Sequence, residues 1–366
     1  MARLVKNKNK ECCGCMLCKN VCPVNAIHVE KNSDGALYPQ INETVCISCG
    51  KCENICAFHC GQSNSVREAY AARRKDDLLL QKSQSGGTFA VLAEHIWECD
   101  GVVYGCAIND DMTIQHIRVE NSSDRTKLYG SKYVQSDIDG VYKQLKRDLK
   151  AERYVLFCGT SCQIAAIKKF ASPYDKNLIT VDILCHGVPG REAFDLYLSH
   201  LEKKYKGSVQ KIKFRDKQVF GWKGAGESIQ INGKWIHSDQ YMTLYNTGLI
   251  FRESCYACPF KCLEHPGDIT IGDLWGVEQV LPEFNDNKGV SLVLVNTDKG
   301  QKILDRVQNS LNYIKIDVSQ CMQEVLKQPA NRPSFKNLYW RLQTVFPNIT
   351  MKAAVLIRKI GYKIHW

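Results

Sequence analysis

Eight cysteines near the N-terminus repeat one spacing twice. The first copy is Cys12-x2-Cys15-x2-Cys18-x3-Cys22, followed by Pro23, and the second is Cys46-x2-Cys49-x2-Cys52-x3-Cys56. Three thiols at this spacing can wrap a tight turn around one corner of an iron–sulfur cubane, with backbone N–H groups aimed at its sulfides. The fourth thiol can reach a second cluster. The chemistry that this spacing predicts is therefore one-electron transfer.

The repeat is the bacterial two-cluster ferredoxin pattern, in which the fourth cysteine of each copy ligates the other cluster. We therefore predict one [4Fe-4S] cluster on Cys12, Cys15, Cys18 and Cys56, and a second on Cys46, Cys49, Cys52 and Cys22. Ala57 stands where the first copy has its proline. Cys13 and Cys60 lie outside the pattern, and we interpret them as bystanders.

A zinc site and a disulfide framework are the alternatives for these cysteines. Zinc sites use pairs of ligands separated by a longer loop, not a run of three plus one that is repeated. Disulfides need an oxidising compartment, and the start MARLVKNKNKECC shows no apolar export segment. We therefore interpret the nineteen cysteines chiefly as metal ligands in a reducing cytoplasm.

Composition and charge fit a soluble globular protein. The 366 residues are 44% hydrophobic and 24% charged, and no apolar run reaches the roughly 18 residues of a membrane helix. Much of the net charge of +11 comes from the segment 325–366, which has no acidic residue. Its basic residues are Lys327, Arg332, Lys336, Arg341, Lys352, Arg358, Lys359 and Lys363. Either the last part of this tail, 351–366, packs on the main domain as a solvated basic helix, or it contacts a membrane surface or an acidic partner. No nucleic-acid motif accompanies it, so no nucleic-acid partner is expected.

The chain after Gly61 has the pattern of an α/β sheet. The segments 154–157 and 178–184 have the character of buried strands, and each leads through a cysteine-bearing turn into a helix. Hairpins are predicted at Asp34-Gly35 and Asn232-Gly233, and a strand pair flanks 109–111. Ligands gather at the carboxyl ends of parallel strands, where both cysteine turns fall.

Six cysteines of this region lie at or beside strand ends. They are Cys158, Cys162, Cys185, Cys255, Cys258 and Cys262. Their spacing suggests a further metal site, although small buried cysteines also fill cores, as is expected for Cys99, Cys106 and Cys321. Separately, the turn Ser85-Gly86-Gly87-Thr88 precedes an apolar helical pattern, which makes it a candidate anion site or an ordinary loop.

Several segments together resemble the coenzyme F420 hydrogenase/dehydrogenase beta-subunit family. In order they are GSKYVQS, CGTSCQIAAIKKF, VDILCHGVPG, FRDK with GW, RESCYACPF and DITIGDLWG. The resemblance runs from about Ser65 to Asn296, and a fused N-terminal ferredoxin is a common arrangement in that family. Ser161 replaces the usual proline of the GTPCQ motif.

The resemblance implies FAD and a third [4Fe-4S] cluster. It places the third cluster on Cys162, Cys185, Cys255 and Cys258, with Cys158 and Cys262 as alternative ligands. It makes the segment Ser85, Gly86, Gly87 and Thr88 a flavin phosphate site. Lys132 is expected near the flavin or substrate and His186 as a proton donor, the alternatives being a surface lysine and a loop-stabilising histidine.

These observations predict an α+β protein, with a ferredoxin-like 2[4Fe-4S] domain followed by an α/β mixed-sheet flavin-binding domain. The expected regions are 1–62 (ferredoxin), 63–135 and 136–325 (the N- and C-terminal regions of the family) and 326–366 (basic tail). The predicted function is a cytoplasmic oxidoreductase that passes electrons between a ferredoxin-like donor, the clusters, FAD and a hydride-accepting small molecule, which could be coenzyme F420. The alternative is a non-catalytic electron-transfer subunit that docks on a partner enzyme.

Overall fold

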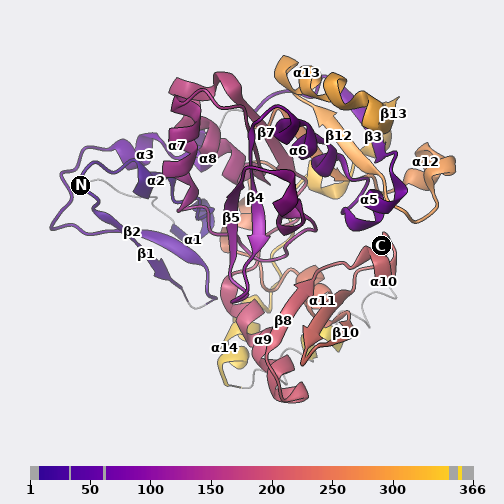
Figure 1. The fold of residues 1–366 in the computed structure, drawn as a ribbon. Helices are drawn as coiled ribbons and strands as arrows, with labels where there is room; N and C mark the ends of the chain where they lie inside the picture. Colours follow the sequence, from indigo (N-terminus) through magenta and orange to yellow (C-terminus); the bar gives the residue numbers. More distant parts are fainter. Residues whose placement is uncertain (1–7, 33, 61–62, 346–352, 357–366) are drawn as a thin grey trace.

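The computed structural model of the chain describes residues 8–32, 34–60, 63–345 and 353–356. The first of these form an N-terminal unit (residues 8–60), which lies to one side of the main body (Figure 1). Its elements are α1 (Lys8–Glu11), α2 (Leu17–Asn20), β1 (Ile27–Lys31), β2 (Leu37–Ile41), α3 (Lys51–Asn54) and α4 (Ala57–Cys60). The predicted hairpin between the two cysteine motifs is confirmed, because β1 and β2 pair antiparallel.

An eight-stranded mixed sheet forms the centre of the main body, in the order β13-β3-β12-β11-β7-β6-β4-β5. The strands are β3 (Glu68–Arg74), β4 (Val102–Ile108), β5 (Ile114–Val119), β6 (Val155–Thr160), β7 (Leu178–Ile183), β11 (Ile269–Asp273), β12 (Ser291–Val295) and β13 (Leu311–Ile316). The four central strands β11, β7, β6 and β4 run parallel, and the outer strands are antiparallel to their neighbours. The predicted strands in β4, β5, β6 and β7 are confirmed, whereas β3, β11 and β13 were not predicted. The two expected regions 63–135 and 136–325 thus supply strands to a single sheet.

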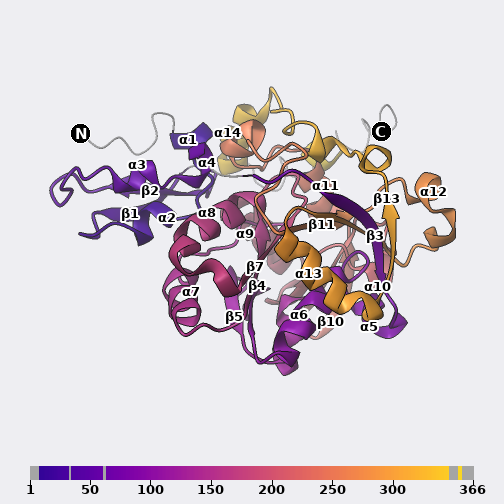
Figure 2. The same ribbon diagram turned by 90° about the horizontal axis from the view of Figure 1, so that it is seen from above.

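Helices cover both faces of this sheet (Figures 1 and 2). One face packs against α7 (Val141–Lys150) and α8 (Ser161–Ala171), and the other against α6 (Thr88–Glu98) and α13 (Asp298–Val307). The apolar faces of these helices meet buried strand residues such as Val155, Phe157 and Leu156. Each fully buried aliphatic side chain contributes roughly 1.5–3 kcal/mol, so these two cores hold the carboxyl edge of the parallel strands in place.

A smaller sheet lies beside the central one. It contains β8 (Val209–Lys213), β9 (Glu227–Ile231) and β10 (Lys234–Ser238), and packs with α9 (Arg191–Tyr205), α11 (Gln240–Asn246) and α14 (Lys336–Val345). The hairpin predicted at Asn232-Gly233 is confirmed, and both residues have the positive φ that such a tight turn requires. Shorter helices are α5 (Asp77–Lys82), α10 (Lys217–Phe220) and α12 (Val277–Val280).

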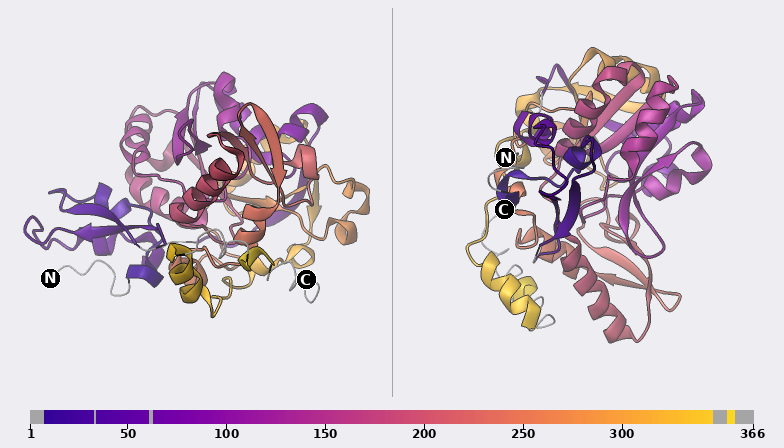
Figure 3. Two further views of the ribbon diagram at one scale, coloured as in Figure 1. Left: turned by 90° about the horizontal axis from the view of Figure 1, so that it is seen from below. Right: turned by 90° about the vertical axis from the view of Figure 1, so that its left-hand side faces the viewer.

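The N-terminal unit is fixed to the sheet by buried contacts. Leu17, Ala57 and Phe58 belong to the same apolar core as α7 and α8, and Figure 3 shows the unit against this side of the body. The hydroxyl of Tyr142 donates to the carbonyl of Cys15 at 2.7 Å. The fully buried Arg252 donates to the carbonyls of Cys12 and Leu37 at 3.1 and 3.0 Å. The backbone that carries the first cysteine motif is therefore held directly by the main body.

Part of the basic tail is used inside the protein. Arg332 forms a bidentate pair with Glu253 at 2.8 and 3.0 Å, and the buried Lys336 pairs with the same carboxylate at 3.0 Å. These two cations are thus engaged within the fold. The alternatives of a packed basic helix and a membrane or partner contact concern 351–366, of which only 353–356 are among the described residues. Lys352, Arg358, Lys359 and Lys363 lie outside the described residues. Within the described ranges, no helix has the length and apolar character to span a membrane.

Candidate functional site

Four cysteines from three segments line one cavity at the carboxyl edge of the parallel strands. We name it the edge cavity; its cysteines are Cys162, Cys185, Cys255 and Cys258. Cys162 lies in the first turn of α8 directly after β6, and Cys185 follows β7. Cys255 and Cys258 come from the 3₁₀ turn Glu253–Ala257 and the residue after it. The four ligands predicted for the third cluster are therefore brought together.

Hydrogen bonds fix the turns that carry these thiols. The N–H of Thr160 donates to Oε1 of Gln163 at 3.0 Å, which caps α8 beside Cys162. Ser161, which stands in place of the family's proline, donates to Asp182 at 2.7 Å. The hydroxyl of Tyr245 donates to the carbonyl of Gly187 at 3.0 Å and holds the turn after Cys185. The cavity is thus shaped by its surroundings before any group binds.

The pKa values of all four edge-cavity thiols are raised, and burial contributes to each shift. Burial raises the pKa of Cys255 to about 12 and also raises the pKa values of Cys185 and Cys258. The pKa of Cys162 is raised first by its hydrogen bond with Cys13 and then by burial. Metal binding must displace these protons, because the thiolate is the ligand.

Two polar atoms that face no partner also belong to this cavity. Lys261 and His265 both line it, and their side chains are buried, with residue exposures of 8% and 2%. The Nζ of Lys261 and the Nε2 of His265 have no hydrogen-bond partner. A buried ammonium without a partner is unfavourable by several kcal/mol, so this donor set fits an anionic group such as a cubane bound by four thiolates.

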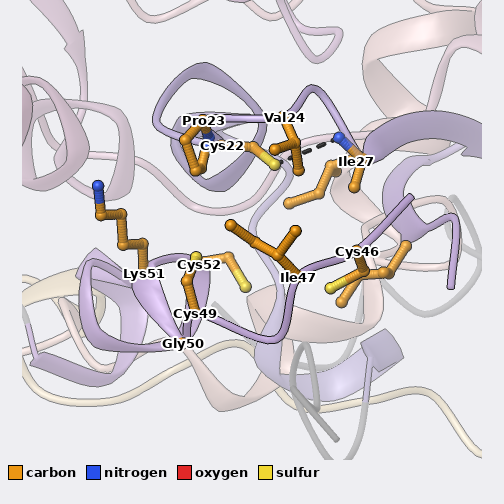
Figure 4. Close-up of a pocket in the computed structure, with 12 residues that line it drawn as sticks. Cys22, Pro23, Val24, Ile27, Cys46, Ile47, Cys49, Gly50, Lys51 and Cys52 are labelled. Atoms are coloured by element: carbon orange, nitrogen blue, oxygen red, sulfur yellow. Dashed lines mark hydrogen bonds between the residues drawn. The ribbon is translucent and has the colours of Figure 1, made fainter. Parts of the chain in front are cut away.

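Three cysteines of the second motif and the last cysteine of the first motif surround another cavity, in the N-terminal unit. We name it the outer cavity; Cys22, Cys46, Cys49 and Cys52 line it. Figure 4 shows these cysteines around the side chains of Val24, Ile27 and Ile47. Cys49 is exposed, and Ile47 is 60% exposed. The cysteine that the crossed pattern assigns to this set, Cys22, does lie with the second motif.

Cys12, Cys15, Cys18 and Cys56 form an inner group between the two cavities. Burial raises the pKa of Cys18 to about 12, and the charges of Cys12 and Cys56 add to this effect. The charge of Cys52, in the outer cavity, also raises the pKa of Cys18, and the charge of Cys162, in the edge cavity, raises the pKa of Cys12. The three sets of thiols thus follow one another from an exposed end of the N-terminal unit to the sheet edge.

No three histidine, cysteine, aspartate or glutamate side chains within the described ranges lie close enough to hold a single metal ion.

The other cysteines fall into different surroundings. Cys13, interpreted as a bystander, hydrogen-bonds with Cys15 and Cys162 and so lies between the inner group and the edge cavity. Cys262 contacts the carbonyls of Pro259 and Glu264. Cys158 lies within β6, on the strand side of the turn. Neither of the two alternative ligands is among the residues that line the edge cavity.

A comparison with protein families matches residues 152–319 to the C-terminal region of the coenzyme F420 hydrogenase/dehydrogenase beta subunit. The match includes all four cysteines of the edge cavity, together with Lys261 and His265. The region 152–319 is thus similar to the C-terminal region of this beta-subunit family.

Among solved structures, the chain is similar to a chain in a xenon-derivatised structure of the F420-reducing [NiFe] hydrogenase complex from Methanosarcina barkeri. The two are 17% identical, the TM-score is 0.48, and the alignment covers 82% of this chain and 92% of the other. The comparison with curated proteins gives no significant match.

Outside the family match, the predicted flavin phosphate turn lies where β3, β12 and the start of α6 meet. The N–H groups of Gly86 and Gly87 already donate to Ser291 Oγ and to the carbonyl of Gln84. A Cβ on Gly86 would lie 2.1 Å from the carbonyl oxygen of Ala72, so this glycine permits close packing against β3. The glycine N–H groups therefore serve the fold rather than a phosphate.

Other donors at this turn have no partner. The hydroxyl of Thr88 and the Nε2 of Gln84 are buried without a hydrogen bond. Gly87 gives α6 no side-chain cap, so the first-turn N–H groups of this 11-residue helix have no partner within the helix. The fit of this turn to a flavin phosphate rests on these donors and on the helix dipole.

Lys132 and His186 have different surroundings. Lys132 donates to the carbonyls of Tyr129 and Lys127, at 2.8 and 3.4 Å. Burial lowers its pKa to about 8, although the neighbouring thiols Cys106 and Cys158 oppose the shift. His186 is exposed beside Cys185. The structure thus places Lys132 at the ends of β4 and β6, and leaves His186 at the mouth of the sheet edge.

Sequence reasoning assigned no role to one polar group at the same edge. Asp273, at the end of β11, accepts from Arg215 at 2.6 Å and from Nε1 of Trp222 at 2.7 Å. Trp275 stacks on Trp222 with ring centroids 5.1 Å apart and remains 38% exposed. FRDK, GW and DLWG were quoted only for the resemblance, and nothing in their spacing shows that they meet.

Proposed function

We propose that this chain is an iron–sulfur flavoprotein oxidoreductase that holds three [4Fe-4S] clusters and FAD. The observation that carries the proposal is the edge cavity, where four cysteines from three segments converge beside an unpartnered lysine and histidine. When bound, a cubane transfers single electrons, and a flavin exchanges single electrons for a hydride. A protein with both types of group can couple one-electron carriers to a hydride-accepting substrate.

The three sets of cysteines would hold clusters at three successive positions. The outer set, Cys22, Cys46, Cys49 and Cys52, lies near an exposed surface, where a ferredoxin or another low-potential donor can approach. Cys12, Cys15, Cys18 and Cys56 supply the inner site, and the edge-cavity cysteines supply the third. Main-body contacts such as Tyr142 to Cys15 hold the spacing between them.

The proposed flavin region lies at the same carboxyl edge of the sheet. The uncapped start of α6, with the orphan donors of Gln84 and Thr88, would hold a flavin phosphate. Trp275, stacked and partly exposed, presents an aromatic face at this edge. The family description names coenzyme F420, so F420 is the first hydride acceptor to assay, followed by other organic acceptors.

Turnover by the isolated chain tests this proposal. The anaerobically purified, cluster-loaded chain is mixed with a reduced ferredoxin and oxidised F420 or another acceptor, and formation of the reduced acceptor is followed by its absorbance. We expect catalytic turnover in at least one direction. If a flavin-loaded chain exchanges electrons only with one-electron carriers, the electron-transfer subunit is the better description.

A further inference from the structure

The edge cavity carries positive and donor groups that are aimed into it. Lys261 brings an ammonium group whose Nζ has no hydrogen-bond partner, and the residue is only 8% exposed. It lies close enough to Cys185 and Cys258 to oppose the rise in their pKa values. Lys261 is the one lysine among the residues that line the edge cavity.

His265 is held in one orientation by a buried carboxylate. Its Nδ1 lies 2.6 Å from Oδ2 of Asp182, which also accepts from Ser161 at 2.7 Å, and Oδ1 accepts from Thr270 at 2.9 Å. Asp182 is fully buried. A carboxylate that fixes one ring nitrogen directs the other nitrogen to its partner, as it does for metal-binding histidines. Nε2 of His265 is that other nitrogen, and it has no hydrogen-bond partner.

The outer cavity has no comparable groups. Apart from its cysteines it is lined by Pro23, Val24, Ala26, Ile27, Ile41, Ile47, Gly50 and Lys51. Its single lysine, Lys51, is exposed to solvent. The positive charge of Arg252 lowers the pKa values of both Cys12 and Cys255. The inner group and the edge cavity therefore share its effect. The difference between the sites lies in Lys261 and His265.

From this difference we infer that Lys261, assisted by His265, gives the third cluster a higher reduction potential than either cluster of the N-terminal unit. A cubane with four thiolates is anionic and gains one further negative charge on reduction, so a buried cation favours the reduced state. Electrons that enter at the outer cavity would then collect at the sheet edge. Neither residue is a ligand of the cluster in this proposal. Lys261 supplies a positive charge beside the cluster, and His265 supplies an oriented ring nitrogen. This inference rests on the proposed function, since it requires the third cluster.

An EPR-monitored redox titration of the loaded chain tests the inference. In Lys261→Met, the signal of the third cluster is expected to shift to lower potential by at least the equivalent of a tenfold change in equilibrium constant, about 59 mV for one electron. His265→Gln is expected to shift the same signal less, in the same direction. The signals of the other two clusters should not move.

Lys168→Met is the matched control. Lys168 is a lysine of α8 whose Nζ donates to the carbonyl of Pro266 at 2.8 Å, but it does not line the cavity. Its removal should leave all three potentials unchanged. A Lys261→Met protein with an unchanged third potential, or a control with an equal shift, would overturn the inference.

Iron content separates failure of the inference from failure of the proposed function. A wild-type chain with about eight irons instead of about twelve lacks the third cluster, which removes the proposed third site and the inference with it. If Lys261→Met alone loses this cluster, Lys261→Arg should restore the iron and the potential, because it keeps the charge. Loss of the cluster in both variants would show that the lysine serves packing and not charge.

Discussion

The outer cavity and the edge cavity each gather four cysteines, yet the chain builds them differently. Three cysteines of the outer cavity lie within seven residues of one another, Cys46 to Cys52. The edge cavity draws its cysteines from two strand ends and a distant 3₁₀ turn, and buries a lysine and a histidine with them. The outer cavity is formed mainly by one short segment of the chain, whereas the edge cavity forms only where distant segments meet at the sheet.

Removing one edge-cavity ligand should give the largest effect. Cys255→Ser is expected to reduce the iron content from about twelve to about eight per chain, because a cubane needs its full ligand set. The two sites of the N-terminal unit should keep their iron. Quantitative iron and sulfide analysis of anaerobically prepared protein measures this difference.

Cys262→Ser provides the matched control for that change. Its thiol contacts only backbone carbonyls outside the cavity, so the variant should keep the wild-type iron content. Loss of iron from Cys262→Ser, with iron retained in Cys255→Ser, would reverse the assignment of these two cysteines.

Arg252 tests how far the two regions depend on each other. Arg252→Met removes charged hydrogen bonds to the carbonyls of Cys12 and Leu37 and to Gln135. At roughly 1.5–3 kcal/mol for a hydrogen bond to a charged group, we expect the free energy of unfolding to fall by about 3 kcal/mol. Urea denaturation measures it, with the exposed Arg147→Met as control, for which a change within about 0.5 kcal/mol is expected. Equal effects of the two variants would contradict a rigid connection through Arg252.

Glu253 links the edge cavity to the tail. In the folded chain its pKa lies below the ordinary value, because hydrogen bonds from Arg332 and Lys336 outweigh its burial, which acts in the opposite direction. Glu253→Gln leaves the buried Lys336 without its nearest carboxylate, and should lower the free energy of unfolding by about 2 kcal/mol. Lys327→Gln is the control, since Lys327 forms an exposed pair with Glu324. If Glu253→Gln were as stable as wild type, the tail would not support this cavity.

The smallest expected effect is a fall in the free energy of unfolding at acid pH, which we attribute to a histidine of the central sheet. Burial lowers the pKa of His116 to about 4, so between about pH 4 and pH 6.5 the unfolded chain binds a proton that the folded chain does not. The free energy of unfolding should therefore fall by about 1 kcal/mol from pH 7 to pH 5.5, and less in His116→Gln. An equal fall in the wild type and in His116→Gln would contradict this assignment.

The contrast between the two cavities also explains which parts of each site could be predicted from the sequence. The pairing of Cys22 with the second motif depends on one repeated spacing, and the hairpin depends on Asp34-Gly35, so both could be predicted locally. The edge-cavity ligands were identified through a family resemblance, because Cys162 and Cys258 are nearly a hundred residues apart and no local pattern relates them.

The residues that distinguish the edge cavity gave no local signal. Lys261 resembles any surface lysine in the sequence, and its burial arises only when the turn after Cys258 folds against β6 and β7. The glycines of the Ser85–Thr88 segment were predicted to offer their N–H groups, but Gly86 is needed for close contact with β3. That strand itself was not predicted, which is why its contact with the turn was missed.

The central claim is that the edge cavity holds a third cluster in a chain that also binds a flavin. Anaerobic purification followed by iron, sulfide and flavin quantification on one sample tests it most directly. We expect about twelve irons and one FAD per chain. About eight irons and no flavin after attempted reconstitution would contradict it, and would leave a two-cluster electron carrier.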